Sequence, residues 1–219
     1  MITVADLPVL SMRLTLPIVG AWVLTAELDG DETPSGAIEL AQGDVRLAGT
    51  VVRAASVAGS VRLTAVGGAG GLHTELGARS YQGATVRDVV SDLLAAAGER
   101  LDASSSRGIL ESALPYWTRP GGREGRAGAS LMRVAEYVDA RWRVLPSGAA
   151  WIGQETWPGA PEEYDALELD RDGAAGWVLL APETIGLLPG VTLRGDRVGR
   201  VEHSFGRDAP LRTTFWIEP

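Results

Sequence analysis

The stretch 43-GDVRLAGTVVRA-54 has a near repeat in 190-GVTLRGDRVGRVEH-203. Each stretch has a glycine, a short alternating segment, a second glycine and then a valine-rich segment. Alternation of apolar and polar residues between glycines is typical of β-strands joined by tight turns. A second pair recurs in the same order, since GAWVLTAEL at 20–28 resembles GWVLLAPET at 176–184. Two interpretations follow: an internal duplication of one β-unit, or two unrelated meanders that share turn chemistry.

The composition is compatible with one large domain or two small ones. The chain has 219 residues, of which 45% are hydrophobic, and its 28 Gly and 12 Pro favour turns over long helices. It contains no Cys, which excludes disulfides and thiolate metal sites. No apolar run reaches the roughly 18–20 residues of a membrane span, and no signal peptide is evident, so we expect no membrane insertion of its own.

The charge is acidic overall, with a formal net charge of −8. All 20 basic residues are Arg. A GC-rich genome is the simpler explanation, since it also accounts for the many Ala, Gly and Val, and selection for bidentate contacts in interfaces is the alternative. Tight non-specific binding to DNA needs clustered cations and is therefore disfavoured.

The pattern of elements predicts a mainly β chain with an α/β middle segment, an α+β fold. Alternating segments separated by Gly, Pro, Asp and Ser turns fill residues 10–81, and they return after residue 161. We therefore expect an N-terminal β-barrel over 1–83, a middle segment over 84–160 and C-terminal strands over 161–219.

The middle segment opens with the clearest helix of the chain. In 85-TVRDVVSDLLAAAGER-100 the apolar residues recur at helical spacing, which predicts a helix over 85–97. Thr85 and Asp88 are placed for a capping box, and Gly98 for a left-handed C-terminal end. Further helices are expected at 104–115 and 129–139, followed by a hairpin over 141–153.

A search for catalytic, metal and cofactor motifs finds none, so we expect no enzyme activity and no cofactor. His203 lies within an alternating strand and is predicted to be structural, and His73 follows a glycine-rich turn. The chain has no Lys for a phosphate loop and no HExxH or Cys ligands for a metal. Paired carboxylates for glycoside cleavage are a spatial arrangement that sequence cannot exclude.

Tryptophan is the enriched aromatic residue, with seven Trp against four Tyr and two Phe. Core packing accounts for most of them, whereas an exposed Trp marks a protein interface or a sugar platform. We assign Trp117, Trp157 and Trp216 to a partner interface.

The order of these elements resembles the baseplate hub family of contractile tails, which includes phage tail hubs, the late-control D type and the hub part of type VI secretion spikes. The resemblance rests on the helix at 85–97, on SLMRVAEYVDARWRVLPSGAAWIG at 130–153 and on LPGVTLRGDRVGRVEHSF at 188–205. It covers most of the chain, without a diagnostic motif, and this chain is shorter than other members.

The resemblance implies a structural, non-enzymatic protein with two tail-tube-like antiparallel barrels around the middle segment. It implies a homotrimer whose pseudo-six-fold ring joins a six-fold tail tube to a three-fold spike, in a virion tail or baseplate made in the host bacterial cytoplasm. The implied partners are the tube protein, the spike protein and other baseplate proteins, with DNA only passing through a lumen. The alternative is a carbohydrate- or cell-wall-binding β-module that uses exposed Trp.

Overall fold

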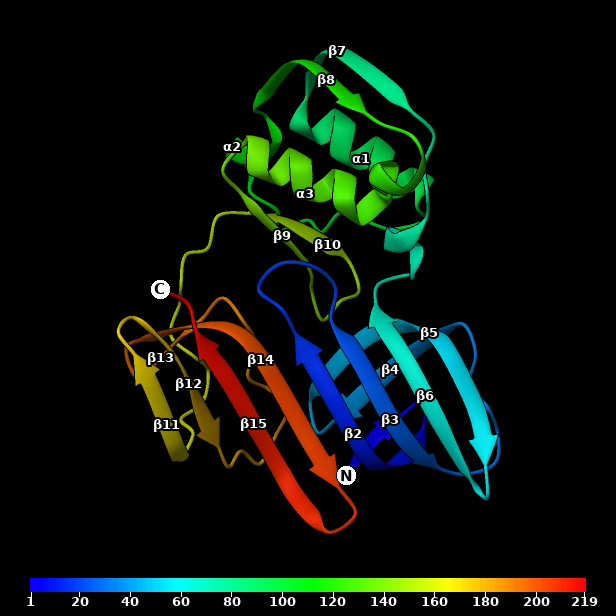
Figure 1. Cartoon of the computed structure of the whole chain (residues 1–219), viewed down its shortest axis with the longest axis vertical. Helices are drawn as coiled ribbons and strands as arrows, with labels where there is room; N and C mark the ends of the chain where they lie inside the picture. The colour runs from blue at the N-terminus through cyan, green and yellow to red at the C-terminus, as the bar shows by residue number, and fades with distance from the viewer. The chain divides into compact units, whose positions relative to one another are not determined.

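The computed structural model describes residues 1–219 and divides them into two compact units (Figure 1). The sheet unit comprises Met1–Val66 and Thr156–Pro219, and the helical unit comprises Gly67–Glu155. The mainly β, α+β class expected from the sequence is confirmed. No helix is both long and hydrophobic enough to cross a bilayer.

A closed antiparallel barrel occupies the N-terminal part of the sheet unit. Its strands run in the order β1-β4-β5-β6-β3-β2, and pairing of β1 with β2 closes the ring. The strands are β1 (Ile2–Val4), β2 (Leu7–Leu16), β3 (Val23–Asp29), β4 (Ala37–Gln42), β5 (Val45–Val57) and β6 (Ser60–Gly67). The strands form because apolar residues alternate along them, and the buried set fills the barrel.

The barrel core depends on one close contact between a glycine and a tryptophan. Trp22 is 1% exposed, and a Cβ added to Gly49 in β5 would lie 2.4 Å from its ring. The same Cβ would lie 2.4 Å from the carbonyl oxygen of Val66. Only glycine therefore fits at this position.

The C-terminal strands form an open sheet that continues from the barrel. Strand β14 (Asp196–Gly206) pairs with β2, from Val201 opposite Leu16 to Phe205 opposite Met12. From there the order is β14-β15-β12-β11, and β13 pairs with β14. These strands are β11 (Ala166–Asp172), β12 (Ala175–Leu180), β13 (Thr192–Leu193) and β15 (Ala209–Ile217). Buried loop residues, among them Ile185 and Leu187, belong to the core of this part.

The two sequence echoes occupy different local environments. Gly49 lies within β5, whereas Gly195 lies in the turn between β13 and β14 with φ +87. Trp22 is buried, whereas Trp177 is half-buried on β12 opposite Trp216. The matching glycines therefore have different roles: Gly49 allows close packing in the barrel, and Gly195 forms a turn.

The helical unit begins before the predicted middle segment. Strand β7 (Arg79–Thr85) pairs with β8 (Ala113–Arg119), so residues 79–83 belong with the helices. The unit also holds the β9 (Arg141–Val144) and β10 (Ala150–Gly153) hairpin, which was expected at 141–153. Two 3-10 turns, η1 (Gly71–His73) and η2 (Gly122–Gly125), complete it.

Helix α1 (Val86–Ala96) confirms the first helix prediction, with its capping box. The Asp88 N–H donates to the Thr85 hydroxyl at 3.2 Å, and the Thr85 N–H donates to the Asp88 carboxylate at 2.8 Å. Gly98 has φ +72, as expected of a left-handed C-terminal end. The helix buries Leu93 completely and contacts α3.

The helix predicted at 104–115 is wrong for most of its length. Helix α2 spans only Arg107–Leu110, and residues from Ala113 onward form β8. Pro115 cannot donate to a helical ladder, and the following Tyr and Trp favour a strand once β7 is available as a partner. Helix α3 spans Ala127–Tyr137, two residues earlier than the predicted 129–139.

Candidate functional site

A continuous polar face crosses the sheet of the sheet unit. The cross-strand register aligns Arg212 of β15, Ser204 of β14, Arg13 of β2, Thr25 of β3 and Thr64 of β6 in one row. Directly opposite residues lie on the same face of a sheet, so all five side chains share this face. The other face holds the apolar side chains of the barrel core, such as Leu14 and Leu24.

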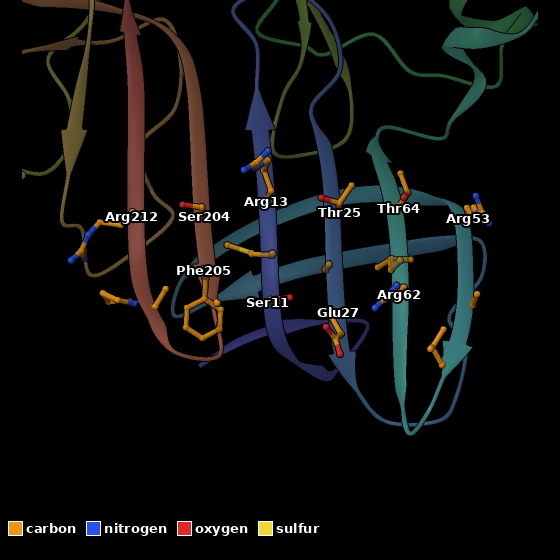
Figure 2. Close-up of a pocket in the computed structure, with 18 residues that line it drawn as sticks. Ser11, Arg13, Thr25, Glu27, Arg53, Arg62, Thr64, Ser204, Phe205 and Arg212 are labelled. Carbon is orange, nitrogen blue, oxygen red and sulfur yellow. The ribbon is translucent and has the colours of Figure 1, made fainter. Parts of the chain in front are cut away.

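Part of the polar face is hollowed, with a cavity volume of about 910 Å³ (Figure 2). The hollow is lined by Arg13, Arg53, Arg62 and Arg212, and Glu27 is its single acidic residue. The chain as a whole has a formal net charge of −8. The hollow is therefore locally basic on an acidic protein.

Ion pairs hold some of these side chains in place. Glu202 lies 3.4 Å from the Arg13 guanidinium and 3.1 Å from that of Arg200, and Glu27 lies 3.3 Å from that of Arg207. The arginines of these pairs are largely exposed, so each pair contributes little to stability. Their effect is to orient long side chains over the sheet.

Two strand segments of the same sheet have a free edge. Strand β11 pairs with β12 on one side, ends the strand order and is exposed at every residue. In β5, pairing with β4 reaches only as far as Thr50 opposite Ala37, and the Val51 N–H still donates to the Gly36 carbonyl at 2.9 Å. From Val52 to Val57 the outer half of β5 therefore has a neighbouring strand only in β6. Unpaired backbone N–H and C=O groups along such edges favour pairing with another strand.

Exposed apolar side chains gather at these two edges. Of the eight large hydrophobic residues that are exposed, four lie there: Val52, Val57, Leu167 and Leu169. Leucine and valine exposed along an unpaired edge favour its burial against a partner.

The three tryptophans predicted at an interface lie on different elements, and each is half-buried. Trp117 on β8, in the helical unit, packs against Tyr81 with ring centroids 5.7 Å apart and ring planes tilted by 52°. Trp157 and Trp216 belong to the sheet unit. The Arg197 guanidinium lies 5.2 Å from the Trp157 ring, and that of Arg200 lies 4.5 Å from the Trp216 ring. A guanidinium thus covers one face of each of these two rings. Their place in a partner interface stays a prediction.

His203 is a core residue, as predicted. It is fully buried, its Nε2 lies 3.1 Å from the Leu187 carbonyl and its Nδ1 lies 2.6 Å from the Thr213 hydroxyl. Because a carbonyl only accepts, Nε2 carries the hydrogen and Nδ1 accepts from Thr213. Burial lowers the pKa of His203 to about 4, although the hydrogen bond to Leu187 acts in the opposite direction. His73 is exposed in the helical unit, and no group of three or more His, Asp or Glu side chains is arranged to hold a metal ion.

Sequence reasoning missed both the arginine-lined hollow and the free edges. The lining arginines are dispersed from position 13 to position 212. The strand order β2-β3-β6-β5 brings Arg62 and Arg53 near Arg13, and the pairing of β2 with β14 adds Arg212. The edges follow from strand order. The one signal in the sequence was the acidic, leucine-containing stretch 163-EYDALELDRD-172.

Comparison with known proteins finds similarity in structure and none in sequence families. No protein-family model matches the sequence, and no curated protein matches it. Among solved structures, the prophage MuSo2 43 kDa tail protein from Shewanella oneidensis is similar with a TM-score of 0.72 and 8% identity, over 96% of this chain and 93% of that one. The tail protein from Neisseria meningitidis MC58 has a TM-score of 0.69 and 12% identity, over 100% of this chain and 96% of that one.

A third similar structure comes from a secretion system. The E. coli c3393 protein is described as a type VI secretion component with structural similarity to the T4 bacteriophage tail proteins gp27 and gp5. It has a TM-score of 0.68 and 13% identity, over 100% of this chain and 76% of that one. Along its whole length, this chain therefore has the fold of phage tail proteins and of a type VI secretion component.

Proposed function

We propose that this chain is a structural, non-enzymatic hub component of a phage tail or a related injection device. The observation that carries the proposal is the fold. It matches two tail proteins over at least 96% of this chain and over more than nine-tenths of each tail protein. The proposal includes that this component is a baseplate hub, such as the late-control D type.

We further propose that three copies form the ring that joins a six-fold tube to a three-fold spike. Support comes from the sheet unit, whose strand order leaves two free edges, and four of its exposed large apolar residues lie on these edges. Edges of this kind are protected in closed assemblies. The proposed partners are the tube, spike and other baseplate proteins of a virion tail, with DNA passing through the lumen.

Light scattering after gel filtration tests the ring. The chain has a mass of 23.0 kDa, so a trimer has three times that mass, about 69 kDa. Electron microscopy of the trimer is expected to show a ring with a central hole. A stable monomer that binds cell-wall glycans would contradict the hub function and support the alternative, a carbohydrate-binding module.

A further inference from the structure

We propose that β11 of one copy pairs with the outer half of β5 in the next copy, so that each copy is joined to its neighbour by a shared β-sheet. This inference rests on the proposed ring and names the surfaces that close it. Both segments belong to the sheet unit, at the two open ends of one run of paired strands, β11-β12-β15-β14-β2-β3-β6-β5. The occupant of each edge is therefore a second copy of this chain.

The two edges differ, and this difference determines the kind of assembly. A strand that pairs with a different strand of its neighbour makes a head-to-tail contact, which repeats until it closes into a ring or grows as a fibre. Each copy has one edge of each kind, so no third surface is needed. Every added copy contributes the same eight strands to a continuous sheet.

Apolar side chains match on one face of the proposed junction. Leu169 lies opposite Val178, which is buried, so Leu169 lies on the core side of the sheet although it is 53% exposed. Arg53, Ala55 and Val57 line the polar hollow, so Val52 points to the other face by strand alternation. Val52 is 60% exposed. Pairing of the two edges therefore covers both Leu169 and Val52, which lie on the face of the sheet opposite the polar hollow.

Charges match along the same junction. Residues 163–172 contain five acidic side chains and a single arginine, Arg171, which is already paired with Asp196. The outer half of β5, residues 52–57, contains Arg53 and no acidic residue, and Arg62 lies on the neighbouring strand β6.

The charges also lie on matching faces. Asp170 lies opposite Trp177, which lies opposite Trp216, so Asp170 is on the polar face. Arg53 is on the polar face too. The acidic edge thus meets the basic edge, whereas pairing of either edge with its own kind brings like charges together.

Cysteine cross-linking tests this pairing directly, because the chain has no native Cys. Leu169→Cys is combined in turn with Val52→Cys, Ala54→Cys or Ser56→Cys, which sample alternate positions along one face of β5. Neighbouring strands bring opposite Cβ atoms to about 4.5–5.5 Å, close enough for a disulfide to form after small shifts. We expect at least one of the three double variants to yield a closed, covalent trimer on oxidation. When a single β11 variant is mixed with a single β5 variant, we expect disulfides only between the β11 cysteine of one copy and the β5 cysteine of another.

The outcomes separate this inference from the ring itself. A trimeric mass with no cross-linked product from any of the three pairs overturns the edge pairing and leaves the ring standing. A monomeric mass together with no cross-links overturns both.

Blocking one edge gives a second test. Leu169→Lys places a charge on the edge and is expected to reduce the trimer to a monomer with unchanged melting of the monomer. Tyr137→Lys, at a residue 61% exposed on α3, is the matched control and is expected to stay trimeric. A trimeric Leu169→Lys variant contradicts the proposal.

Discussion

Acidification to pH 5 is expected to destabilise the sheet unit through His203. Burial lowers the pKa of His203 from its ordinary value of 6.5 to about 4. The unfolded chain therefore takes up a proton between these two values while the folded chain does not, so stability is complete above pH 6.5 and falls as the pH drops toward 4. With these two pKa values, folding loses about 2 kcal/mol at pH 5 and roughly 3 kcal/mol below pH 4.

The measurement is urea unfolding at pH 7 and pH 5, followed by Trp fluorescence at fixed protein concentration. Because carboxylates also titrate, the comparison is made with His203→Gln, which cannot take up the proton. The variant is less stable at pH 7, since it disturbs the contacts with Leu187 and Thr213, but its loss between pH 7 and pH 5 should be smaller by about 2 kcal/mol. Equal losses in the two proteins would refute the assignment of a buried neutral histidine.

Three further substitutions test the packing. Gly49→Ala is expected to destabilise the barrel by about 3 kcal/mol in thermal or urea unfolding, because the new Cβ meets both Trp22 and the backbone; Gly43→Ala, with open space around it, controls for turn strain alone, and equal effects of the two would contradict the packing argument. Leu93→Asp buries a charge on α1 and should abolish folding of the helical unit, measured by circular dichroism, whereas Ala95→Asp on the exposed face should not. Glu99→Gln is expected to cost about 1–3 kcal/mol in urea unfolding, because its carboxylate accepts the N–H groups of Ala69 and Gly71 at 2.9 Å and an amide satisfies only one; an unchanged midpoint would show that the loop is held otherwise.

Local structure was largely predictable from the sequence because its causes are local. The alternation in SVRLTAV is found as β6, and the Thr85 cap and the Gly98 end are found on α1. The failure at 104–115 has a physical cause too, since residues 113–119 form a strand only because β7 is in place to pair with them.

The candidate surfaces depended on pairings between distant residues, which no local pattern reveals. The polar row forms only when Ser204 of β14 lies beside Arg13 of β2. The two similar stretches that suggested a repeated β-unit are alike in sequence but not in structural role. Gly49 packs against the Trp22 ring, whereas Gly195 lies in a turn.

The pairing of β2 with β14 also bears on how the chain is made. Strand β2 ends at Leu16 and its neighbour β14 starts at Asp196, so the 179 residues 17–195 must be synthesised in between. At about 5–20 residues per second, one side of β2 waits roughly ten to forty seconds on the ribosome before its partner exists. During that interval the nascent barrel exposes an unpaired strand edge that is prone to aggregation. We therefore expect chaperones to bind the chain mainly at this stage of synthesis.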